Sequence, residues 1–240
     1  MAINTRIFAH RGASHYAPEN TLPAFQLANE MGASGVELDV QLTKDNIPVI
    51  IHDENVRRTT NGVGFVQDYT FEDIKQLDAG SWYNERFANT TIPSLEEFLK
   101  WVQTTNMTIN LELKTNVINY VHIEAIVNEM IEHFNLENRT ILSSFNPETI
   151  RRLSDMNSQI ERAWLTQMRI RKVHLLLNDI GAQSIHIKTR LLSSNMLKRI
   201  LQEEIPYRVY TVNRVKTLKR CEQLQADAIF TDLPDLLTKP

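Results

Sequence analysis

Short apolar and β-branched runs alternate along the chain with longer stretches in which apolar residues recur at helical spacing. Nine of the short runs have the length and composition of strands: 6–10, 35–40, 48–52, 108–114, 140–145, 160–165, 183–188, 207–212 and 227–231. The segments after most of them, such as PETIRRLSDM and SSNMLKRILQEE, have a helical pattern. Strands that alternate with helices are typical of βαβ units and indicate a parallel sheet.

Two of these strands lie too close together in the sequence to be parallel neighbours. The segment QLTKDNI separates 35–40 from 48–52, whereas a parallel crossover needs about a dozen residues or more. The pattern therefore predicts a hairpin here and, with the hairpin counted once, eight βα units. Eight units favour an α/β fold of the closed (β/α)₈ TIM-barrel type, and an open doubly wound sheet is the alternative, because a strand count does not show closure.

The connection from Asp53 to Asn106 is too long for a simple loop. It contains the turn-rich segment NGVG and two short helical patterns, TFEDIKQL and SLEEFLKWV. Compact domains seldom carry so long a connection unless it has a structure or function of its own. We therefore expect residues 1–240 to form one barrel domain, with about 54–92 as a small insertion over one end of the barrel.

Composition narrows the functional classes. The formal net charge of −3 gives no general attraction for nucleic acid or an anionic membrane, so any basic site must be local. Cys221 is the only cysteine, which excludes an intramolecular disulfide and fits a reducing compartment. The N-terminal segment has no secretory apolar core, and no apolar run approaches the roughly 20 residues that span a bilayer. We expect a cytoplasmic protein that neither binds nucleic acid nor inserts into a membrane.

Charged residues occupy alternate positions of two predicted strands. Glu37 and Asp39 share one face of GVELDV, and Glu112 and Lys114 share one face of INLELK, since side chains alternate across a strand. In a barrel the apolar face packs under the helices, which turns the charges inward toward the mouth. An antiparallel sheet with one wet face would show the same alternation and is the alternative for either strand alone.

Three carboxylates that converge in a barrel need a counter-charge. Without one they repel each other, and the pKa of at least one of them rises. Carboxylate oxygens without cysteine favour one divalent cation, Mg²⁺ or Ca²⁺, with Mn²⁺ as a further choice. Lys114 offers the metal-free alternative, because its ammonium group would neutralise part of the charge.

Two histidines and an arginine stand at predicted strand ends. His10 ends the first strand and His52 ends the hairpin strand, and two histidines provide an acid and a base near neutral pH. A single histidine at a strand end more often has a structural role. Arg11 adds a planar cation suited to phosphate, with a salt bridge to a nearby acid as the alternative. Gly12 frees the backbone directly after this pair.

Several ordered motifs together resemble one family. They are HRGASHYAPENTLPAF, GVELDVQLTKDNIPVIIHD, RTTNG, IPSLEEFL and INLELK, followed by SSFNPE, YTVN and IFTDLPD. In this order, over nearly the whole chain, they are similar to the glycerophosphodiester phosphodiesterase family, which shares its barrel with the phosphatidylinositol phospholipases C. Tyr210 stands where members often have tryptophan, and AIFTD replaces a more glycine-rich GIITD. Both departures concern substrate preference more than chemistry.

The resemblance implies a (β/α)₈ barrel with a small insertion, one divalent cation, and hydrolysis of glycerophosphodiesters such as glycerophosphocholine or glycerophosphoethanolamine. The products would be glycerol 3-phosphate and an alcohol. The family's site residues correspond here to the metal carboxylates Glu37, Asp39 and Glu112, the acid and base His10 and His52, and the phosphate ligands Arg11 and Lys114.

The resemblance also implies a route in which the glycerol 2-hydroxyl attacks phosphorus and water then opens a cyclic phosphate. Direct attack by water is the competing route, and the sequence does not assign which histidine is the base. A lipid-directed phospholipase would show a secretion signal or an apolar rim. A phosphoester-binding protein without catalysis would lack an acid, a base or a ligand, whereas every expected position is filled here.

Overall fold

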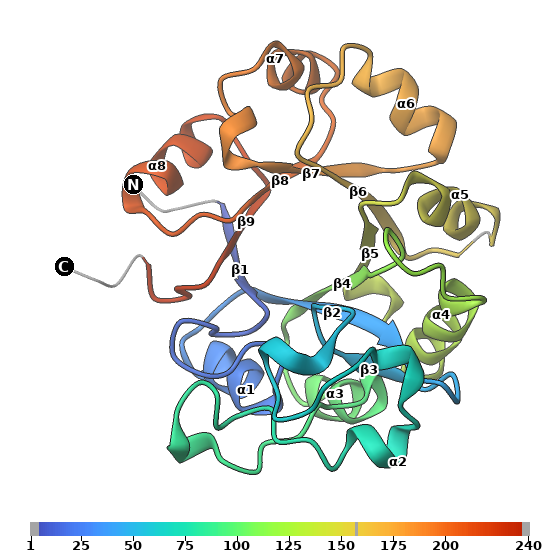
Figure 1. The fold of residues 1–240 in the computed structure, drawn as a ribbon. Helices are drawn as coiled ribbons and strands as arrows, with labels where there is room; N and C mark the ends of the chain where they lie inside the picture. The colour runs from blue at the N-terminus through green and yellow to red at the C-terminus, as the bar shows by residue number, and fades with distance from the viewer. Residues whose placement is uncertain (1–4, 157, 237–240) are drawn as a thin grey trace.

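The computed structural model describes residues 5–156 and 158–236, which contain all nine expected strands, with ends shifted by at most two residues (Figure 1). The strands are β1 (Arg6–His10), β2 (Gly35–Leu42), β3 (Pro48–Ile50), β4 (Thr108–Leu113), β5 (Thr140–Ser144), β6 (Glu161–Thr166), β7 (Ser184–Lys188), β8 (Tyr207–Tyr210) and β9 (Ala228–Thr231). The apolar runs therefore located every strand of the described chain.

Eight of the strands form a closed parallel barrel, seen end-on as the central ring of Figure 1. The order β1-β9-β8-β7-β6-β5-β4-β2 closes because β1 also pairs in parallel with β2. Only β3 lies outside this ring. It pairs antiparallel with β2, which confirms the predicted hairpin. The TIM barrel is confirmed, and the open-sheet alternative is wrong.

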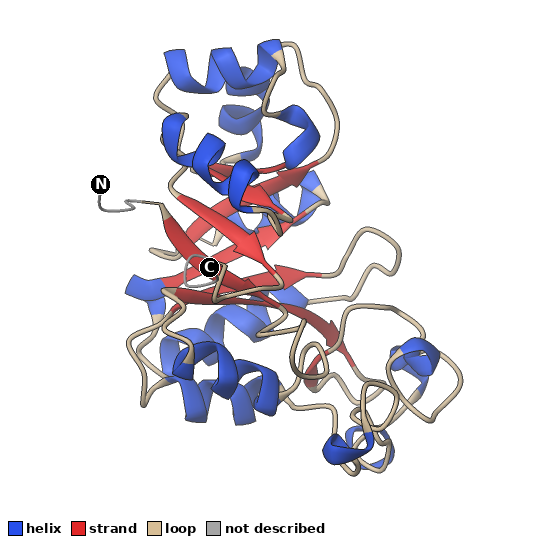
Figure 2. Cartoon of the chain, turned by 90° about the vertical axis from the view of Figure 1, so that its left-hand side faces the viewer, coloured by secondary structure: helices blue, strands red, loops and turns tan. Residues whose placement is uncertain are grey.

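Helices cover the outside of the barrel between consecutive parallel strands (Figures 1 and 2). They are α1 (Leu22–Glu30), α3 (Leu95–Val102), α4 (Ile123–His133), α5 (Pro147–Asp155), α6 (Val173–Ile180), α7 (Asn195–Gln202) and α8 (Val215–Gln223). Side chains cap several of the helices. Ser94 and Glu97 form a capping box at α3, and Thr21 caps α1 by accepting a hydrogen bond from the backbone N–H of Ala24.

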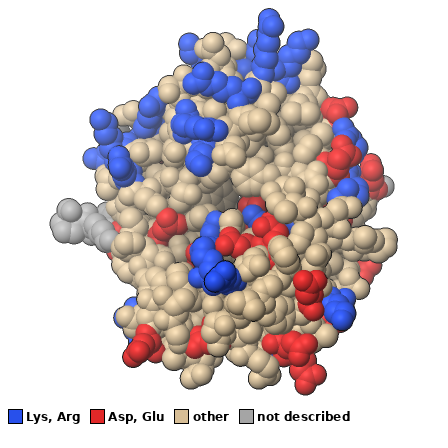
Figure 3. All heavy atoms as spheres, in the orientation of Figure 1, with Lys and Arg blue, Asp and Glu red and all other residues tan. Residues whose placement is uncertain are grey.

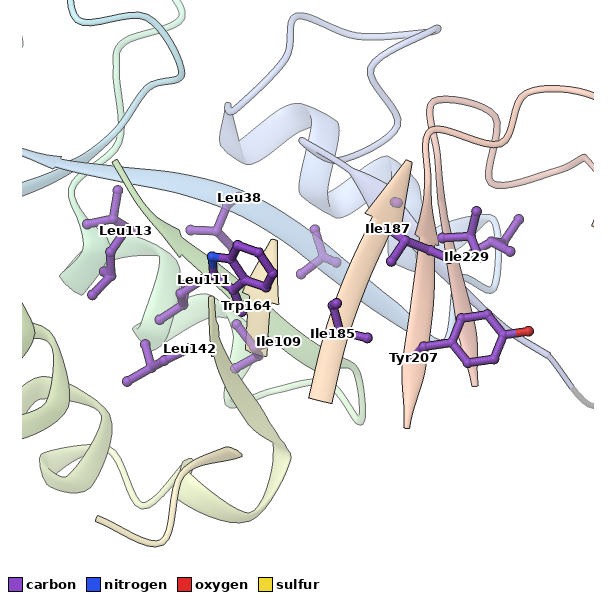
Figure 4. Close-up of a cluster of buried hydrophobic side chains, with 14 of the residues drawn as sticks. Leu38, Ile109, Leu111, Leu113, Leu142, Trp164, Ile185, Ile187, Tyr207 and Ile229 are labelled. Carbon is purple, nitrogen blue, oxygen red and sulfur yellow. The ribbon is translucent and has the colours of Figure 1, made fainter. Parts of the chain in front are cut away.

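The barrel wall is buried on both faces, as parallel sheets require. Leu38, Leu111 and Ile185 are fully buried in the main core between strands and helices, and Figure 4 shows these side chains along β2, β4 and β7. All eight residues of β2 are buried. The apolar positions of β2 and β4 thus face the helices, and the charged positions alternate with them inside the barrel.

The segment between β3 and α3 contains a four-residue helix and three short 3₁₀ helices. They are η1 (Val56–Arg58), η2 (Val66–Asp68), α2 (Phe71–Ile74) and η3 (Glu85–Phe87). Figure 2 shows the segment beside the barrel, at the end where β3 lies. It has a small core of its own, which includes Val56, Val66 and Ile74. The expected helical pattern at TFEDIKQL is therefore present but short.

Candidate active site

One end of the barrel holds the predicted chemistry, because β1, β2 and β4 run parallel and end at the same edge. A cavity of about 230 Å³ opens there. Five of the seven predicted site residues line it: His10, Arg11, Glu37, His52 and Glu112. The other two, Asp39 and Lys114, are buried beside these residues and contact them without lining the cavity. Figure 3 shows the acidic and basic atoms gathered in the central hollow.

The three predicted carboxylates come together. Glu37, Asp39 and Glu112 each offer an oxygen atom, and these oxygens lie within 4.8 Å of one another. The strand register explains the arrangement, because Asp39 on β2 lies opposite Glu112 on β4. All three side chains are buried, and Asp39 Oδ1 has no hydrogen-bond partner in the described structure. The structure therefore concentrates negative charge where water is scarce.

The pKa values of Glu37 and Asp39 show that ionising all three buried carboxylates together is unfavourable. Burial, reinforced by the nearby charge of Asp39, raises the pKa of Glu37 to about 8. Burial also disfavours ionised Asp39, but Arg11 and Lys114 outweigh this effect and hold its pKa below the usual range. The cluster is thus under-neutralised by the side chains around it. Three close carboxylates, in a cluster where Asp39 Oδ1 has no hydrogen-bond partner in the described structure, fit a hard divalent cation.

Arg11 is held by the acids around it. Its Nε lies 3.3 Å from Asp39 Oδ2, and its guanidinium donates a 2.8 Å hydrogen bond to Glu19. Arg11 has a φ of +57°, and its backbone N–H donates a 2.9 Å hydrogen bond to Glu37. The next residue, Gly12, has a φ of +80°, and a Cβ there would lie 2.7 Å from the backbone of Ala24. Glycine is therefore required where the chain leaves β1.

Lys114 lies behind the acidic cluster. Its Nζ donates a 2.9 Å hydrogen bond to Glu112 and lies 3.7 Å from Asp39. Burial would lower the pKa of Lys114, but these two carboxylates raise it above the ordinary value. The structure is thus compatible with both interpretations of the sequence, the metal-free one and the divalent-cation one. The ammonium group of Lys114 neutralises part of the acidic charge, and the same cluster also fits a cation.

His10 presents its two ring nitrogens to two different carboxylates. Nδ1 lies 2.7 Å from Asp232 Oδ1, and Nε2 lies 4.0 Å from Glu37 Oε2. Burial opposes ionisation of Asp232, but the hydrogen bond from His10 dominates and keeps the pKa of Asp232 low. An ionised carboxylate only accepts hydrogen bonds, so Nδ1 is the donor and Nε2 faces the cavity. Burial lowers the pKa of His10, but Glu37 and Asp232 together raise it overall.

His52 is oriented in the same way. Its Nδ1 lies 2.6 Å from Asp53 Oδ1. Burial raises the pKa of Asp53, but hydrogen bonds from Arg58 and His52 bring it down to about 2. Asp53 is therefore ionised and accepts from Nδ1–H, which leaves Nε2 of His52 for the cavity that it lines.

Arg58 connects this second histidine to the first βα loop. Its Nε donates a 2.6 Å hydrogen bond to Asp53, and its two terminal nitrogens each lie 2.8 Å from an oxygen of Glu19. Glu19 in turn accepts from Arg11. Sequence reasoning missed Asp53, Asp232 and Arg58. Asp53 directly follows His52, and this adjacency was a usable signal, whereas the other two have no comparable local signal.

A model of the Glycerophosphoryl diester phosphodiesterase family matches residues 10–236. The chain belongs to this family. A glycerophosphodiester phosphodiesterase of Bacillus altitudinis is 42% identical over 238 residues, which make up 98% of this chain and 97% of that relative. As a member of the glycerophosphoryl diester phosphodiesterase family, the protein is a phosphoric diester hydrolase.

Solved structures agree with this assignment. The glycerophosphodiester phosphodiesterase of Agrobacterium tumefaciens is 30% identical with a TM-score of 0.84, over 97% of this chain and 98% of that one. A phosphodiesterase of Oleispira antarctica, solved with the product sn-glycerol-3-phosphate, is also 30% identical, with a TM-score of 0.89 over 97% and 95% of the two chains. Among the described residues, no helix combines the length and apolar character that crossing a bilayer requires.

The remaining cavity wall is partly aromatic. Tyr210 and Phe145 line the cavity, and their rings meet edge-on at 5.9 Å. The Tyr210 hydroxyl is buried and has no hydrogen-bond partner in the described structure. Trp82 and Tyr83 lie in the segment before α3 and do not line the cavity, and the Tyr83 hydroxyl donates to the backbone carbonyl of His15. The wall is therefore aromatic on the strand side only.

Proposed function

We propose that the protein hydrolyses glycerophosphodiesters such as glycerophosphocholine and glycerophosphoethanolamine to glycerol 3-phosphate and an alcohol, with a divalent cation and two histidines. One observation carries this proposal. Two histidines, each held at Nδ1 by an ionised carboxylate, line the same cavity as two members of a three-carboxylate cluster. The product seen in the Oleispira antarctica structure supports the substrate class.

Glu37, Asp39 and Glu112 are the proposed cation ligands, and Mg²⁺ or Ca²⁺, with Mn²⁺ as a further choice, suits their oxygen donors. When bound, such a cation would stabilise negative charge on the non-bridging phosphate oxygens. It would also provide the counter-charge that keeps Glu37 ionised at neutral pH, where burial and Asp39 otherwise favour its protonated form.

Arg11 is the proposed protein ligand of the phosphate. It lines the cavity, and its buried Nε makes no hydrogen bond in the described structure, although Asp39 lies 3.3 Å away. A guanidinium fork fits phosphate oxygens. Lys114 is the proposed second cationic partner of the phosphate, and it stands behind Glu112 in the structure. Arg11 and Lys114 would stabilise the negative charge that develops on the phosphoryl oxygens in the transition state.

His10 and His52 are the proposed general acid and base. One removes a proton from the attacking oxygen, and the other gives a proton to the leaving alkoxide, each through Nε2. The attacking oxygen is either the glycerol 2-hydroxyl, which forms a cyclic phosphate, or water. A substrate analogue without the 2-hydroxyl separates the routes, because it is inert on the first and is hydrolysed on the second.

The proposed function is tested with a panel of glycerophosphodiesters. Release of glycerol 3-phosphate is measured with added Mg²⁺, Ca²⁺ or Mn²⁺ and again with excess EDTA. We expect release with at least one cation and loss of release with EDTA. Full activity in EDTA would contradict the cation, and a protein inactive on the whole panel would contradict the function.

We also propose that the chain works as one phosphodiesterase domain in the cytoplasm, in lipid and glycerol metabolism, with residues 54–92 as an insertion at the mouth. The contact of Arg58 with Glu19 supports the position of the insertion. The single cysteine fits a reducing compartment. Cell fractionation followed by the phosphodiesterase assay tests the location.

A further inference from the structure

One side of the barrel mouth is basic. The segments 167–172, 188–194 and 211–216, which run from the ends of β6, β7 and β8 toward the next helices, carry seven exposed cations, here called the basic rim: Arg169, Arg171, Lys172, Lys188, Arg190, Arg214 and Lys216. Segments 167–172, 188–194 and 211–216 contain no Asp or Glu. Figure 3 shows Lys and Arg side chains gathered over the part of the molecule where Figure 1 has α7 and α8. The local charge is thus opposite to the net charge of −3.

The charges of the basic rim are not neutralised within the described structure. No carboxylate there lies within 4.0 Å of any of the seven cationic groups. Arg190 donates hydrogen bonds of 2.6 and 3.2 Å to the backbone carbonyl of Gln167, which links two of the three segments. On the opposite side of the mouth, Arg58 is paired with both Glu19 and Asp53. The basic rim therefore keeps its charge available for an anion.

The basic rim begins at the cavity itself. Lys188 lines the cavity, and Arg190 lies close enough to Tyr210, another lining residue, to act on its hydroxyl electrostatically. The acidic cluster lies on β2 and β4, across the barrel from these segments. The cavity of about 230 Å³ is smaller than the roughly 300–1,000 Å³ of typical ligand pockets. A large alcohol group therefore has to extend out of the cavity, and the basic rim borders it on the side away from the acidic cluster.

We propose that the basic rim binds a second anionic group on the alcohol side of the substrate. The enzyme then prefers glycerophosphodiesters whose alcohol carries a further phosphate to those with an uncharged alcohol. This inference rests on the proposed function and adds a substrate class to it. Clustered Arg and Lys side chains are suited to phosphate, and unpaired surface charge raises the local concentration of an anionic substrate.

A membrane surface is the less favoured partner for the basic rim. Interfacial binding needs buried apolar area as well as cations. Of the large apolar side chains that are exposed in the described structure, only Met168 and Val215 lie in these three segments. The cations, in contrast, continue onto the cavity wall at Lys188.

The test compares two soluble substrates that differ by one phosphate. One is glycerophosphoglycerol, and the other is glycerophosphoglycerol with a phosphate monoester on the free end of its alcohol glycerol. Loss of the diester is followed by ³¹P NMR, and the ratio of the two kcat/KM values is the readout. At low ionic strength we expect the second substrate to be favoured about tenfold, and we expect the ratio to fall as salt is added.

A matched pair of variants locates the effect. Lys172→Gln with Lys216→Gln removes two charges from the basic rim, and Lys198→Gln with Lys219→Gln removes two exposed charges from α7 and α8. We expect the rim variant to lower the ratio about threefold, because attraction falls with the local charge. The helix variant is expected to keep the wild-type ratio.

Each other outcome is decisive. If neither substrate is hydrolysed, the proposed function fails. If the wild-type enzyme hydrolyses both with equal kcat/KM, or if both variants lower the ratio alike, the basic rim does not select the substrate, and the proposed function stands. Sedimentation with phosphatidylglycerol vesicles that is lost only in the rim variant, together with a ratio of one, would overturn the proposal in favour of a membrane surface.

Discussion

Both ends of the barrel gather charged side chains around at least one buried charge, but they balance the charges differently. At the mouth, the acids Glu37, Asp39 and Glu112 share the cations Arg11 and Lys114. At the opposite end, where the strands begin, Arg208 donates hydrogen bonds of 2.7 and 3.1 Å to Glu161 and lies 2.8 Å from Asp227. Arg6 completes that network at 2.7 Å from Asp227.

The comparison shows which arrangement of charged side chains indicates an active site. Two arginines face two carboxylates at the amino end, so these ion pairs are complete without a ligand. Three carboxylates face two cations at the mouth, and one of them, Glu37, has a pKa raised to about 8. Burial of charge alone therefore does not mark the active site. An excess of one sign, left uncompensated by the protein, indicates where a cation and substrate bind.

The largest expected effect is on activity at the mouth. Glu37→Gln removes a proposed cation ligand and relieves repulsion within the cluster. We expect release of glycerol 3-phosphate to fall on the order of 10³-fold, while stability to urea in EDTA stays the same or rises. Glu96→Gln, at an exposed position of α3, is the control. Full activity of Glu37→Gln would contradict the conclusion that the excess negative charge at the mouth marks the active site.

At the amino end the same kind of change should affect stability instead. Arg208→Met removes the buried partner of Glu161 and Asp227, and because both carboxylates are about one-third exposed, we expect a loss of about 1.5–3 kcal/mol of unfolding free energy. We expect kcat of the folded enzyme to be unchanged. Arg6→Met removes a half-exposed member of the same network and should cost at most about 1 kcal/mol. Urea unfolding measures both, and equal losses would contradict the comparison.

The histidines test whether the mouth supplies proton transfer. His10→Ala and His52→Ala should each fold normally and lose turnover on the order of 10²-fold or more. His133→Ala, at an exposed position of α4, is the matched control. Steady-state rates and circular dichroism separate lost chemistry from lost structure. Turnover close to wild type in either variant would end that histidine's assignment.

Binding of a divalent cation to the acidic cluster should raise the free energy of unfolding. Mg²⁺, Ca²⁺ or Mn²⁺ at a hundred times its Kd stabilises a protein that binds it by about 2.7 kcal/mol. We expect this gain in the wild-type enzyme and little of it in Glu37→Gln, by urea unfolding with and without the cation. No stabilisation of the wild type by any of the three ions would favour the metal-free role of Lys114.

The smallest effect is a pH dependence at the amino end. Burial, followed by the charge of Arg208, lowers the pKa of His186 well below 6.5. The unfolded chain therefore binds a proton that the folded one rejects, and stability is lost as pH falls below about 6.5, by at most about 1.4 kcal/mol per pH unit. Urea unfolding between pH 7 and pH 5.5 should show a shallower loss for His186→Gln. The exposed control His133→Gln should keep the wild-type slope.

The hydrophobic and polar pattern along the sequence predicted the barrel and the charged residues that β2 and β4 bring to its mouth. The period of two in β2 and β4 placed Glu37, Asp39 and Glu112 on the inner face, because that period depends only on neighbouring residues. Their convergence then followed from pairing of the two strands, Asp39 opposite Glu112. The same rule placed Lys114 beside Glu112, where the structure has it at 2.9 Å.

Contacts between residues far apart in the sequence were not predictable. His10 and Asp232 meet only when β9 closes the barrel against β1. Arg208 and Glu161 meet across β7 at the amino end, and neither has a local pattern that differs from a surface charge. The Asn20 side chain donates a 2.8 Å hydrogen bond to Asp39, and no local pattern indicates this contact. Such contacts depend on the closed fold.

Arg58 has a consequence for how members of this family can be recombined. It comes from the segment after β3, yet it holds Asp53, which orients His52, and Glu19, which holds Arg11. A chimera that exchanges residues 54–92 for those of a relative therefore also exchanges the support of His52 and Arg11, the proposed proton-transfer group and the proposed phosphate ligand. The segment after β3 and the proposed catalytic groups are therefore structurally coupled, and a transplanted segment needs an arginine at this position to remain compatible with its new barrel.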